Sequence, residues 1–246
     1  MENKIQNLDK PSICFKEDFF DGAKKSLPIV MGYIPVSFTF GIMARGVGLD
    51  ALTTVLISMT NFTSAGQFAG TNIIVSGGAY MEIAVTTFII NIRYTLMSLA
   101  LSQKINKMSV IKKLIIAFGI TDETFTVSSF ENGNVSFPYM LGLSLFSYLS
   151  WITGTLLGAT ASNFLSERLQ NAMGVALYGM FLALIVPSAK SDKRILLVIV
   201  VALSISSLFR YIPLLSDVSS GWTVIISTVI ASTFGAILFE EESLDE

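Results

Sequence analysis

Long apolar segments alternate with short charged stretches along most of the chain. Segments that are long and apolar enough to cross a membrane as helices cover residues 27–44, 83–102, 137–161, 172–187, 195–213 and 222–239. A helix rises about 1.5 Å per residue, so about 20 apolar residues cross the roughly 30 Å hydrocarbon core of a bilayer. The pattern therefore predicts an all-α, polytopic transmembrane helical bundle with about six full spans.

Two further segments are apolar at their ends but polar in their centres. Residues 50–80 are too polar and Gly-rich for one span and too short for two, which predicts a broken helix or a re-entrant hairpin. Residues 114–130 carry Asp122 and Glu123 in their middle and are expected either to dip in and out of the membrane or to lie at its interface. If both cross completely, the count is eight. In the first span, Pro35 predicts a kink or a break.

The charged residues gather at the ends of the predicted spans. They are only 14% of the chain, against 52% hydrophobic residues. The predicted organisation is a polar tail over residues 1–25, one transmembrane domain over 26–239 and an acidic tail over 240–246. Lysine and arginine concentrate at residues 24–25, 104–113 and 190–194. Because such clusters favour the cytoplasm, we expect all three clusters and both termini to be cytoplasmic.

Two short motifs suggest internal organisation. "SLPIVMG" at residues 26–32 resembles "SFPYMLG" at residues 136–142, which leaves open a repeated half or a coincidence. "WITGTLLG" places Gly154 and Gly158 four residues apart, a pattern typical of close helix packing.

Several chemistries are excluded by the residues that the chain lacks. There is no histidine, the only cysteine is Cys14 in the polar tail, and no Walker A loop occurs. A His-based metal site, a Ser-His-Asp triad and ATP hydrolysis are therefore excluded, and no cofactor or metal is expected. No basic patch with interleaved aromatics indicates nucleic-acid binding. The chain is not expected to be an enzyme. The remaining roles are movement of a solute and a structural or sensory role in the membrane.

Arg93 lies near the middle of the span at 83–102. Placing its charge there costs at least about 2.5–3.5 kcal/mol, so it requires a partner or a water-filled space. On a helical projection Thr87 and Asn91 fall on one face and Arg93 almost opposite, which predicts a helix with little lipid contact. Asp122 and Glu123 are the predicted counter-charges, because Glu82, Glu131 and Asp217 lie near segment ends. The charges either fix two helices together or line a substrate or proton pathway.

The Gly-rich stretch "NFTSAGQFAGTN" at residues 61–72 adds a second polar set. A helix interruption here exposes backbone N–H and C=O groups that can bind a carboxylate or an ammonium, and Gln67 adds an amide that donates and accepts. The alternative is structural, with Gly66 and Gly70 permitting tight packing and Gln67 bonding a neighbour.

The succession of "LPIVMGYIPVSFTFGIMARGVGL", "SAGQFAG", "NIRYTLMSLALS" and "TDETF" resembles the AzlC family of bacterial branched-chain amino-acid exporters. The resemblance implies substrate binding by Gln67, Gly66, Asn91 and Arg93, and proton coupling or an ion pair at Asp122 and Glu123. Many relatives have a histidine where this chain has Tyr94, which argues against a proton relay at that position.

The resemblance also implies a partner and a location. The partner is a small AzlD-like membrane subunit, and the location is the bacterial cell (inner) membrane. The expected function is export of leucine, isoleucine, valine and in some cases methionine, coupled to a proton or ion gradient. The alternatives are a non-transporting membrane assembly subunit and an exporter of another small apolar solute.

Overall fold

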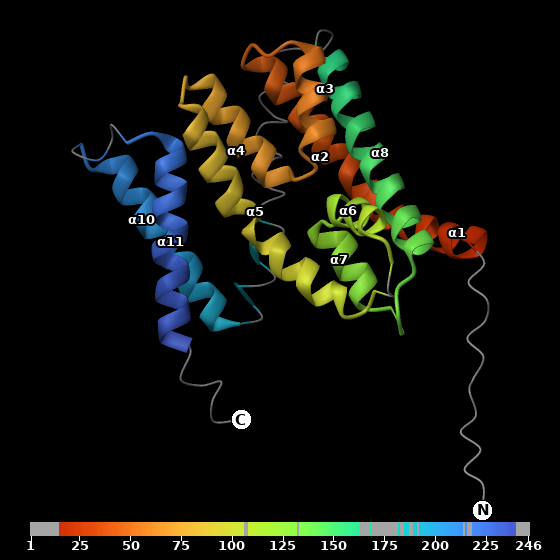
Figure 1. Ribbon diagram of the computed structural model, residues 1–246. Coiled ribbons are helices and arrows are strands. Elements are labelled where there is room, and N and C mark those ends of the chain that lie inside the picture. Colours follow the sequence, from red (N-terminus) through yellow and green to blue (C-terminus); the bar gives the residue numbers. More distant parts are fainter. Residues whose placement is uncertain are drawn as a thin grey trace, which may run out of the picture. The chain divides into compact units, whose positions relative to one another are not determined.

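The computed structural model is built from helices throughout the part of the chain that it describes. That part comprises residues 15–105, 108–131, 133–162, 168, 182, 185–186, 189–190, 192–213, 215 and 218–239. Its helices, shown in Figure 1, are α1 (Phe15–Lys25), α2 (Leu27–Gly46), α3 (Ala51–Thr60), α4 (Ser64–Val75), α5 (Tyr80–Ser102), α6 (Val110–Phe118), α7 (Asp122–Ser129), α8 (Phe137–Ala161), α10 (Lys193–Tyr211) and α11 (Ser220–Phe239).

Five of these helices are long and apolar enough to cross a membrane. They are α2, α5, α8, α10 and residues Gly221–Leu238 of α11. Five of the six predicted full spans are therefore confirmed, and the chain is an all-α polytopic membrane protein. The sixth predicted span, residues 172–187, lies almost entirely outside the described residues, as do residues 1–14 and 240–246 of the predicted tails.

Both segments with polar centres form two short helices instead of one long helix. Residues 50–80 contain α3 and α4, which are separated by residues 61–63, and residues 114–130 contain the end of α6 and all of α7. The predicted interruption of residues 50–80 is confirmed, whereas the predicted dip or interfacial position of residues 114–130 stays a prediction. How deeply each enters the membrane stays a prediction.

Helix α2 continues without a break through Pro35 to Gly46. The predicted break is therefore wrong, whereas the alternative of a kink stays a prediction. A proline removes one backbone donor, but the other peptide groups of an apolar segment still need helical hydrogen bonds. Continuing the helix satisfies more of these groups than ending it would.

Two compact units share the chain. The first comprises Met1–Tyr33 and Tyr94–Ser150, and the second comprises Ile34–Arg93 and Trp151–Glu246. Each boundary falls inside a long helix, α2, α5 or α8. The single transmembrane domain over residues 26–239 stays a prediction, as does the internal repeat, although both repeat motifs begin a spanning helix.

In the first unit, α1 crosses α8 at two glycines. A Cβ atom on Gly22 would lie 2.1 Å from the Tyr139 carbonyl oxygen, and one on Gly142 would lie 2.1 Å from the Phe19 carbonyl oxygen. No other residue fits at these positions without displacing backbone. The start of α8 is therefore fixed against the amphipathic helix that precedes the first span.

Charged residues meet at one end of this unit. Lys25, just before α2, forms an ion pair with Glu131, and Lys104, just after α5, donates to the Ser129 and Glu131 carbonyl oxygens. The hydrogen bond to Glu131 raises the pKa of Lys25. Burial raises the pKa of Glu131, but hydrogen bonds from Lys25 and Tyr139 outweigh it and leave that pKa lowered. The lysines before the first span and after the span at 83–102 thus lie on the same side, as predicted.

In the second unit, α2 and α8 pack backbone to backbone. A Cβ atom on Gly158 would lie 2.0 Å from the Phe38 carbonyl oxygen, and one on Gly41 would lie 2.4 Å from the Thr155 carbonyl oxygen. Gly154 likewise approaches the Ile34 carbonyl oxygen. The close-packing face predicted from "WITGTLLG" is confirmed. In the same unit α10 and α11 lie side by side and share a Ser206–Ser227 hydrogen bond of 3.3 Å (Figure 1).

Candidate functional site

The helix break between α3 and α4 is fixed by a buried aromatic residue. Phe62 lies in the break, is buried, and packs edge-on against Trp151 of α8 with ring centroids 6.5 Å apart. Asp50 begins α3 by accepting a hydrogen bond from the Thr53 backbone N–H at 3.1 Å. Asp50 thus holds the end of α3 that lies away from the break, and the break itself is held by the packing of Phe62 against α8.

Thr63 precedes α4 in the capping position, but its hydroxyl does not cap that helix. It donates instead to Asn91 Oδ1 of α5 at 2.8 Å. Gly66 permits this arrangement, because a Cβ atom there would lie 2.9 Å from the Thr63 methyl carbon and 3.2 Å from Asn91 Nδ2. Two of the predicted substrate-binding residues, Gly66 and Asn91, therefore meet at the start of α4.

Backbone groups without partners inside a helix lie on both sides of the break. The first N–H groups of a helix have no partner inside it, and the first bond of this kind in α4 runs from Gln67 N to Thr63 O at 3.0 Å. Asn91 Nδ2 makes no hydrogen bond with a described residue. The last carbonyls of α3 supply the complementary acceptors. The break combines donors for a carboxylate with acceptors for an ammonium.

Gln67 is the centre of a buried hydrogen-bond network and is only 1% exposed. Its Oε1 accepts from Trp151 Nε1 at 3.2 Å, and its Nε2 donates to Ser58 Oγ at 3.2 Å. Ser58 is in turn 2.8 Å from Thr155 Oγ1. The amide thus joins α3, α4 and α8. This favours the structural alternative for Gln67, and a direct substrate contact stays a prediction.

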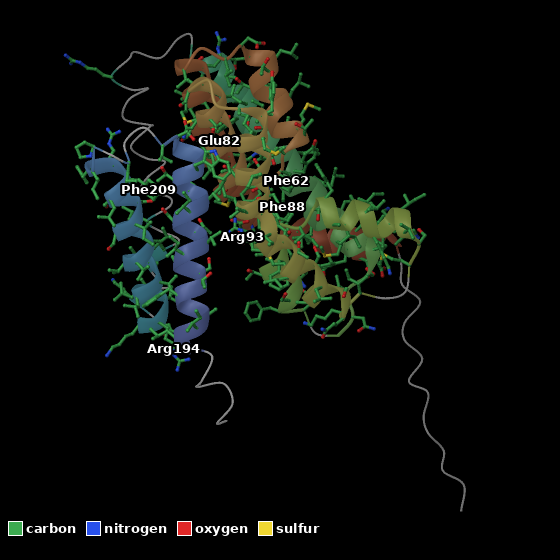
Figure 2. The ribbon with its side chains drawn as sticks, turned by 60° about the vertical axis from the view of Figure 1, so that its left-hand side comes forward. Phe62, Glu82, Phe88, Arg93, Arg194 and Phe209 are labelled. Atoms are coloured by element: carbon green, nitrogen blue, oxygen red, sulfur yellow. The ribbon has the colours of Figure 1, made fainter. Side chains whose placement is uncertain are left out.

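Arg93 leaves α5 on the side away from the break. It follows Asn91 by two residues, about 200° around a helix, and Asn91 faces α4. Figure 2 labels Arg93 on this helix, where it is partly buried. Gly66, Gln67 and Asn91 are therefore brought together, whereas Arg93 points elsewhere.

Asp122 and Glu123 form the first turn of α7 in the other unit. Thr121 and Thr124 make a reciprocal capping box at its start. The Tyr33 hydroxyl donates to Glu123 Oε2 at 2.5 Å and lies 2.7 Å from Thr121 Oγ1. Acidic groups are favoured at a helix N-terminus by the helix dipole. This placement stabilises their charge without reference to Arg93, and the ion pair predicted for them stays a prediction.

Glu82 is a buried acid that reasoning from the sequence placed at a segment end and set aside. It is only 5% exposed and accepts hydrogen bonds from the Ser219 hydroxyl and, at 2.9 Å, from the Gly221 backbone N–H. It therefore caps the N-terminus of α11 from α5, as Figure 2 shows. A carboxylate at this position is favoured by the dipole of α11.

One face of α5 is apolar and exposed. Phe88 is 66% exposed and Leu96 is 69% exposed, and Ile92 and Leu99 continue the stripe; Figure 2 labels Phe88. The prediction that this helix has little lipid contact is wrong along this stripe. The helical projection located the polar faces of α5 but did not consider the apolar sector between them.

Sequence reasoning also missed Tyr33, Thr63 and Trp151. Each lies in a motif that was singled out for another reason: Tyr33 beside the prolines of the first span, Thr63 in the Gly-rich stretch and Trp151 in the small-residue motif. For Tyr33 and Trp151 a signal was available in the sequence, because a buried Trp or Tyr usually needs a hydrogen-bond partner for its polar atom. This signal does not identify the residue that forms the hydrogen bond.

Comparisons with known proteins agree with this architecture. The family model described as AzlC protein matches residues 28–165, more than half of the chain. The chain is 31% identical to the Inner membrane protein YgaZ of Escherichia coli over 185 residues, which cover 72% of this chain and 76% of that protein.

Two further relatives come from other organisms. A membrane protein of Archaeoglobus fulgidus is 36% identical over 70% of this chain and 76% of its own length. The Branched-chain amino acid transport protein AzlC of Bacillus subtilis is 20% identical over 69% of this chain and 67% of its own length. No solved structure matches the chain. The chain belongs to the AzlC family of membrane transport proteins.

Proposed function

We propose that this protein is a secondary exporter of the branched-chain amino acids leucine, isoleucine and valine, with methionine as an occasional cargo. The observation that carries the proposal is the α3–α4 break, where the N-terminus of α4 has no side-chain cap, lies next to Asn91 and follows the carbonyl end of α3 along the chain. A zwitterion complements both ends of such a break. The Bacillus subtilis relative, named as a branched-chain amino acid transport protein, supports the choice of substrate.

The residue roles follow from this placement. Asn91 and the N–H groups near Gly66 bind the substrate carboxylate, and Gln67 holds the break open through Ser58 and Trp151. Arg93 takes part in substrate binding at a different point of the pathway from the break, because it leaves α5 on the opposite side from Asn91. Asp122 and Glu123 are the proposed proton-coupling groups, because a carboxylate held by Tyr33 changes its hydrogen bonding when it is protonated.

The location and partner are part of the same proposal. We place the protein in the bacterial cell (inner) membrane with both termini in the cytoplasm, in accord with the name of the Escherichia coli relative and with the lysine clusters. A small AzlD-like membrane subunit is the proposed partner, on the strength of the family resemblance.

Efflux from loaded cells tests the function. Cells are loaded with a leucine-containing dipeptide, and leucine efflux is followed with this protein and the small subunit present. Asn91→Leu, Arg93→Ala and Asp122→Asn are expected to slow efflux per molecule. Unchanged efflux in variants that insert and assemble normally would contradict the assigned roles.

A non-transporting assembly subunit is the second candidate. The observation that favours it is the Gln67 network, whose hydrogen bonds join three helices inside the protein. This candidate predicts that the same substitutions lower the amount of complex in the membrane and leave efflux per molecule unchanged. Quantifying the inserted protein in the efflux experiment separates the two candidates.

A further inference from the structure

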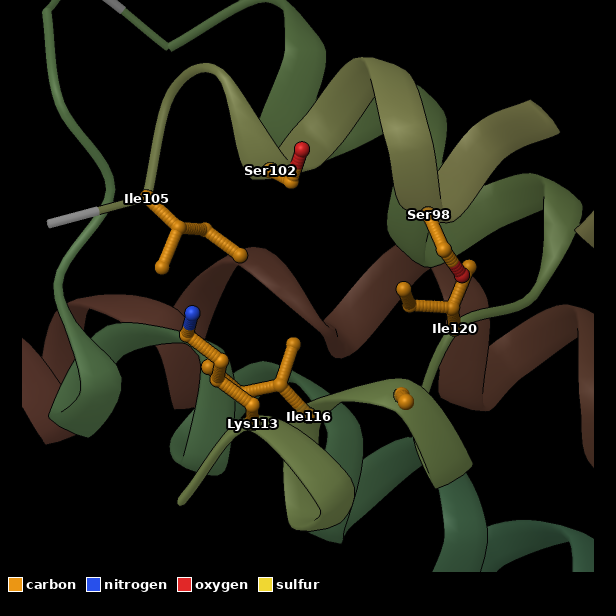
Figure 3. A pocket seen from close by; sticks show the side chains of 7 residues that line it. Ser98, Ser102, Ile105, Lys113, Ile116 and Ile120 are labelled. Atoms are coloured by element: carbon orange, nitrogen blue, oxygen red, sulfur yellow. The ribbon is translucent and has the colours of Figure 1, made fainter. Parts of the chain in front are cut away.

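A cavity of about 320 Å³ lies between the end of α5 and helix α6 in the first unit. It is separate from the helix break discussed above and involves none of the residues assigned there. Figure 3 shows its lining, which includes Ser98, Ser102, Ile105, Lys113, Ile116 and Ile120. Most of its wall is therefore apolar, and one ammonium group stands at the side where Ile105 lies.

Lys113 differs from its described neighbours in the lysine-rich stretch. Lys104 is engaged by the Ser129 and Glu131 carbonyls, and Lys112 lies over the Phe137 ring at 5.2 Å. The Lys113 ammonium makes no ion pair or hydrogen bond with a described residue. Its charge is available to a ligand in the cavity that it lines.

The two hydroxyl groups that line the cavity also differ in whether they have a hydrogen-bond partner. The Ser102 hydroxyl donates to the Leu99 carbonyl at 2.6 Å, whereas the Ser98 hydroxyl makes no hydrogen bond with a described residue. Figure 3 shows Ser98 beside Ile120, away from Lys113. The available donors are thus one ammonium and, farther along the cavity, one hydroxyl.

The lining favours an anion over a zwitterion. It contains no Asp or Glu. An amino acid bound here would pair its carboxylate with Lys113 but would find no charged partner for its ammonium group. A molecule with an anionic head and apolar chains leaves no charge unpaired.

The position of the cavity fits the edge of the membrane. Ser102 ends the spanning helix α5, and Ser98 lies one turn deeper. The adjoining face of α6 is apolar and exposed, with Val110 71%, Ile111 70% and Leu114 65% exposed and Phe118 continuing it. A short helix with such a face is typical of the interface, where acyl chains begin.

We propose that this cavity binds an anionic phospholipid. The phosphate is held by Lys113, an ester carbonyl accepts from Ser98, and an acyl chain runs along the exposed face of α6. The order of charge, hydroxyl and apolar surface follows the order of phosphate, ester and chain in the lipid. The site does not depend on which solute the protein transports.

Native mass spectrometry of the purified full chain in detergent tests the site. Dioleoylphosphatidylglycerol and dioleoylphosphatidylcholine are titrated separately, and the apparent Kd of the first bound lipid is measured. The wild-type protein is expected to prefer the anionic lipid, and Lys113→Gln to weaken that lipid about five-fold, the factor that one lysine contributes at an anionic surface. Lys113→Arg should retain the wild-type affinity.

Matched controls keep the test decisive. Lys112→Gln removes the same charge one residue away and is expected to change the Kd less than about two-fold, because its ammonium lies over Phe137. Ser98→Ala should weaken both lipids slightly. The proposal is overturned if the two lysine variants lose the same lipid affinity or if the wild-type protein does not prefer the anionic lipid. It is also overturned if leucine displaces the lipid. Circular dichroism confirms that each variant is folded.

Discussion

The helix break before α4 and the helix break before α7 satisfy their backbone groups in different ways. At α7, Thr121 and Thr124 cap the helix reciprocally, and the Gly119 carbonyl at the end of α6 accepts from Thr124 and Ser144 hydroxyls at 2.9 and 3.2 Å. At α4, the Thr63 hydroxyl is turned to Asn91 and the helix has no side-chain cap. The break before α7 is therefore closed on itself, whereas the break before α4 keeps its donors for another group.

Removing the amide at the open break has the largest expected effect. Asn91→Leu takes away Nδ2, a donor to the substrate carboxylate, and releases the Thr63 hydroxyl to cap α4. A hydrogen bond to a charged group contributes about 1.5–3 kcal/mol, so leucine affinity is expected to fall about ten- to hundred-fold. Isothermal titration calorimetry of the purified protein measures it. Asn72→Leu, an exposed position on α4, is the control and should bind leucine normally.

Gln67→Leu tests whether the open break depends on the network behind it. The substitution removes the acceptor of Trp151 Nε1 and the donor to Ser58 Oγ, and losing the partner of a buried polar group costs about 1–3 kcal/mol. The unfolding temperature, followed by tryptophan fluorescence, is expected to fall by several degrees. Gln103→Leu, at an exposed position after α5, should not change it. An unchanged unfolding temperature in Gln67→Leu would contradict the structural role.

The two threonines that precede α4 and α7 give the most direct contrast between the breaks. Thr121→Val removes a cap and is expected to lower the free energy of unfolding by about 1 kcal/mol without changing leucine affinity. Thr63→Val removes no cap, so it should weaken leucine binding more than it changes stability. Chemical unfolding and calorimetry on the same preparations measure both quantities. The same pattern of losses in both variants would show that the breaks do not differ as described.

The smallest expected effect concerns the charged end of the first unit. The lowered pKa of Glu131 means that its contribution is present above the ordinary value of 4.5 and is lost as the pH falls through the lowered pKa. The raised pKa of Lys25 means that its contribution is present below 10.5 and is lost as the pH rises through the raised pKa.

Glu131→Gln should therefore lower stability between these limits by less than about 1 kcal/mol, since both side chains are partly exposed. It should also flatten the loss of stability at acidic pH. Unfolding temperatures measured from pH 3 to pH 8 test this, with Glu17→Gln, an exposed position on α1, as the control. If the unfolding temperature of Glu131→Gln falls as steeply toward acidic pH as that of the wild type, the Glu131 carboxylate does not have the role assigned to it.

Hydropathy was sufficient to predict the long helices. It also marked the two segments in which short helices are separated by a break. Apolar length requires a helix inside a membrane, so α2, α5, α8, α10 and α11 follow from composition alone. The polar centres at residues 61–72 and 121–123 likewise marked the two breaks. These predictions rest on local properties of the chain, which a single sequence contains in full.

The difference between the breaks was not predictable in the same way. Thr63 and Thr121 both precede a helix, and both are good capping residues. Thr63 fails to cap because Asn91, 28 residues later, takes its hydroxyl. Glu82 was set aside as terminal because its partners Ser219 and Gly221 lie more than 130 residues away. Choices among partners depend on tertiary contacts that periodicity does not record.

The central claim is that the open break before α4 binds the carboxylate of an apolar amino acid. Calorimetric titration of the wild-type protein with leucine, 4-methylpentanoate and leucinol tests it directly, because leucinol keeps the ammonium and the side chain but lacks the carboxylate. Leucine is expected to bind, 4-methylpentanoate to bind more weakly, and leucinol not to compete. Leucinol competing as well as leucine would contradict it.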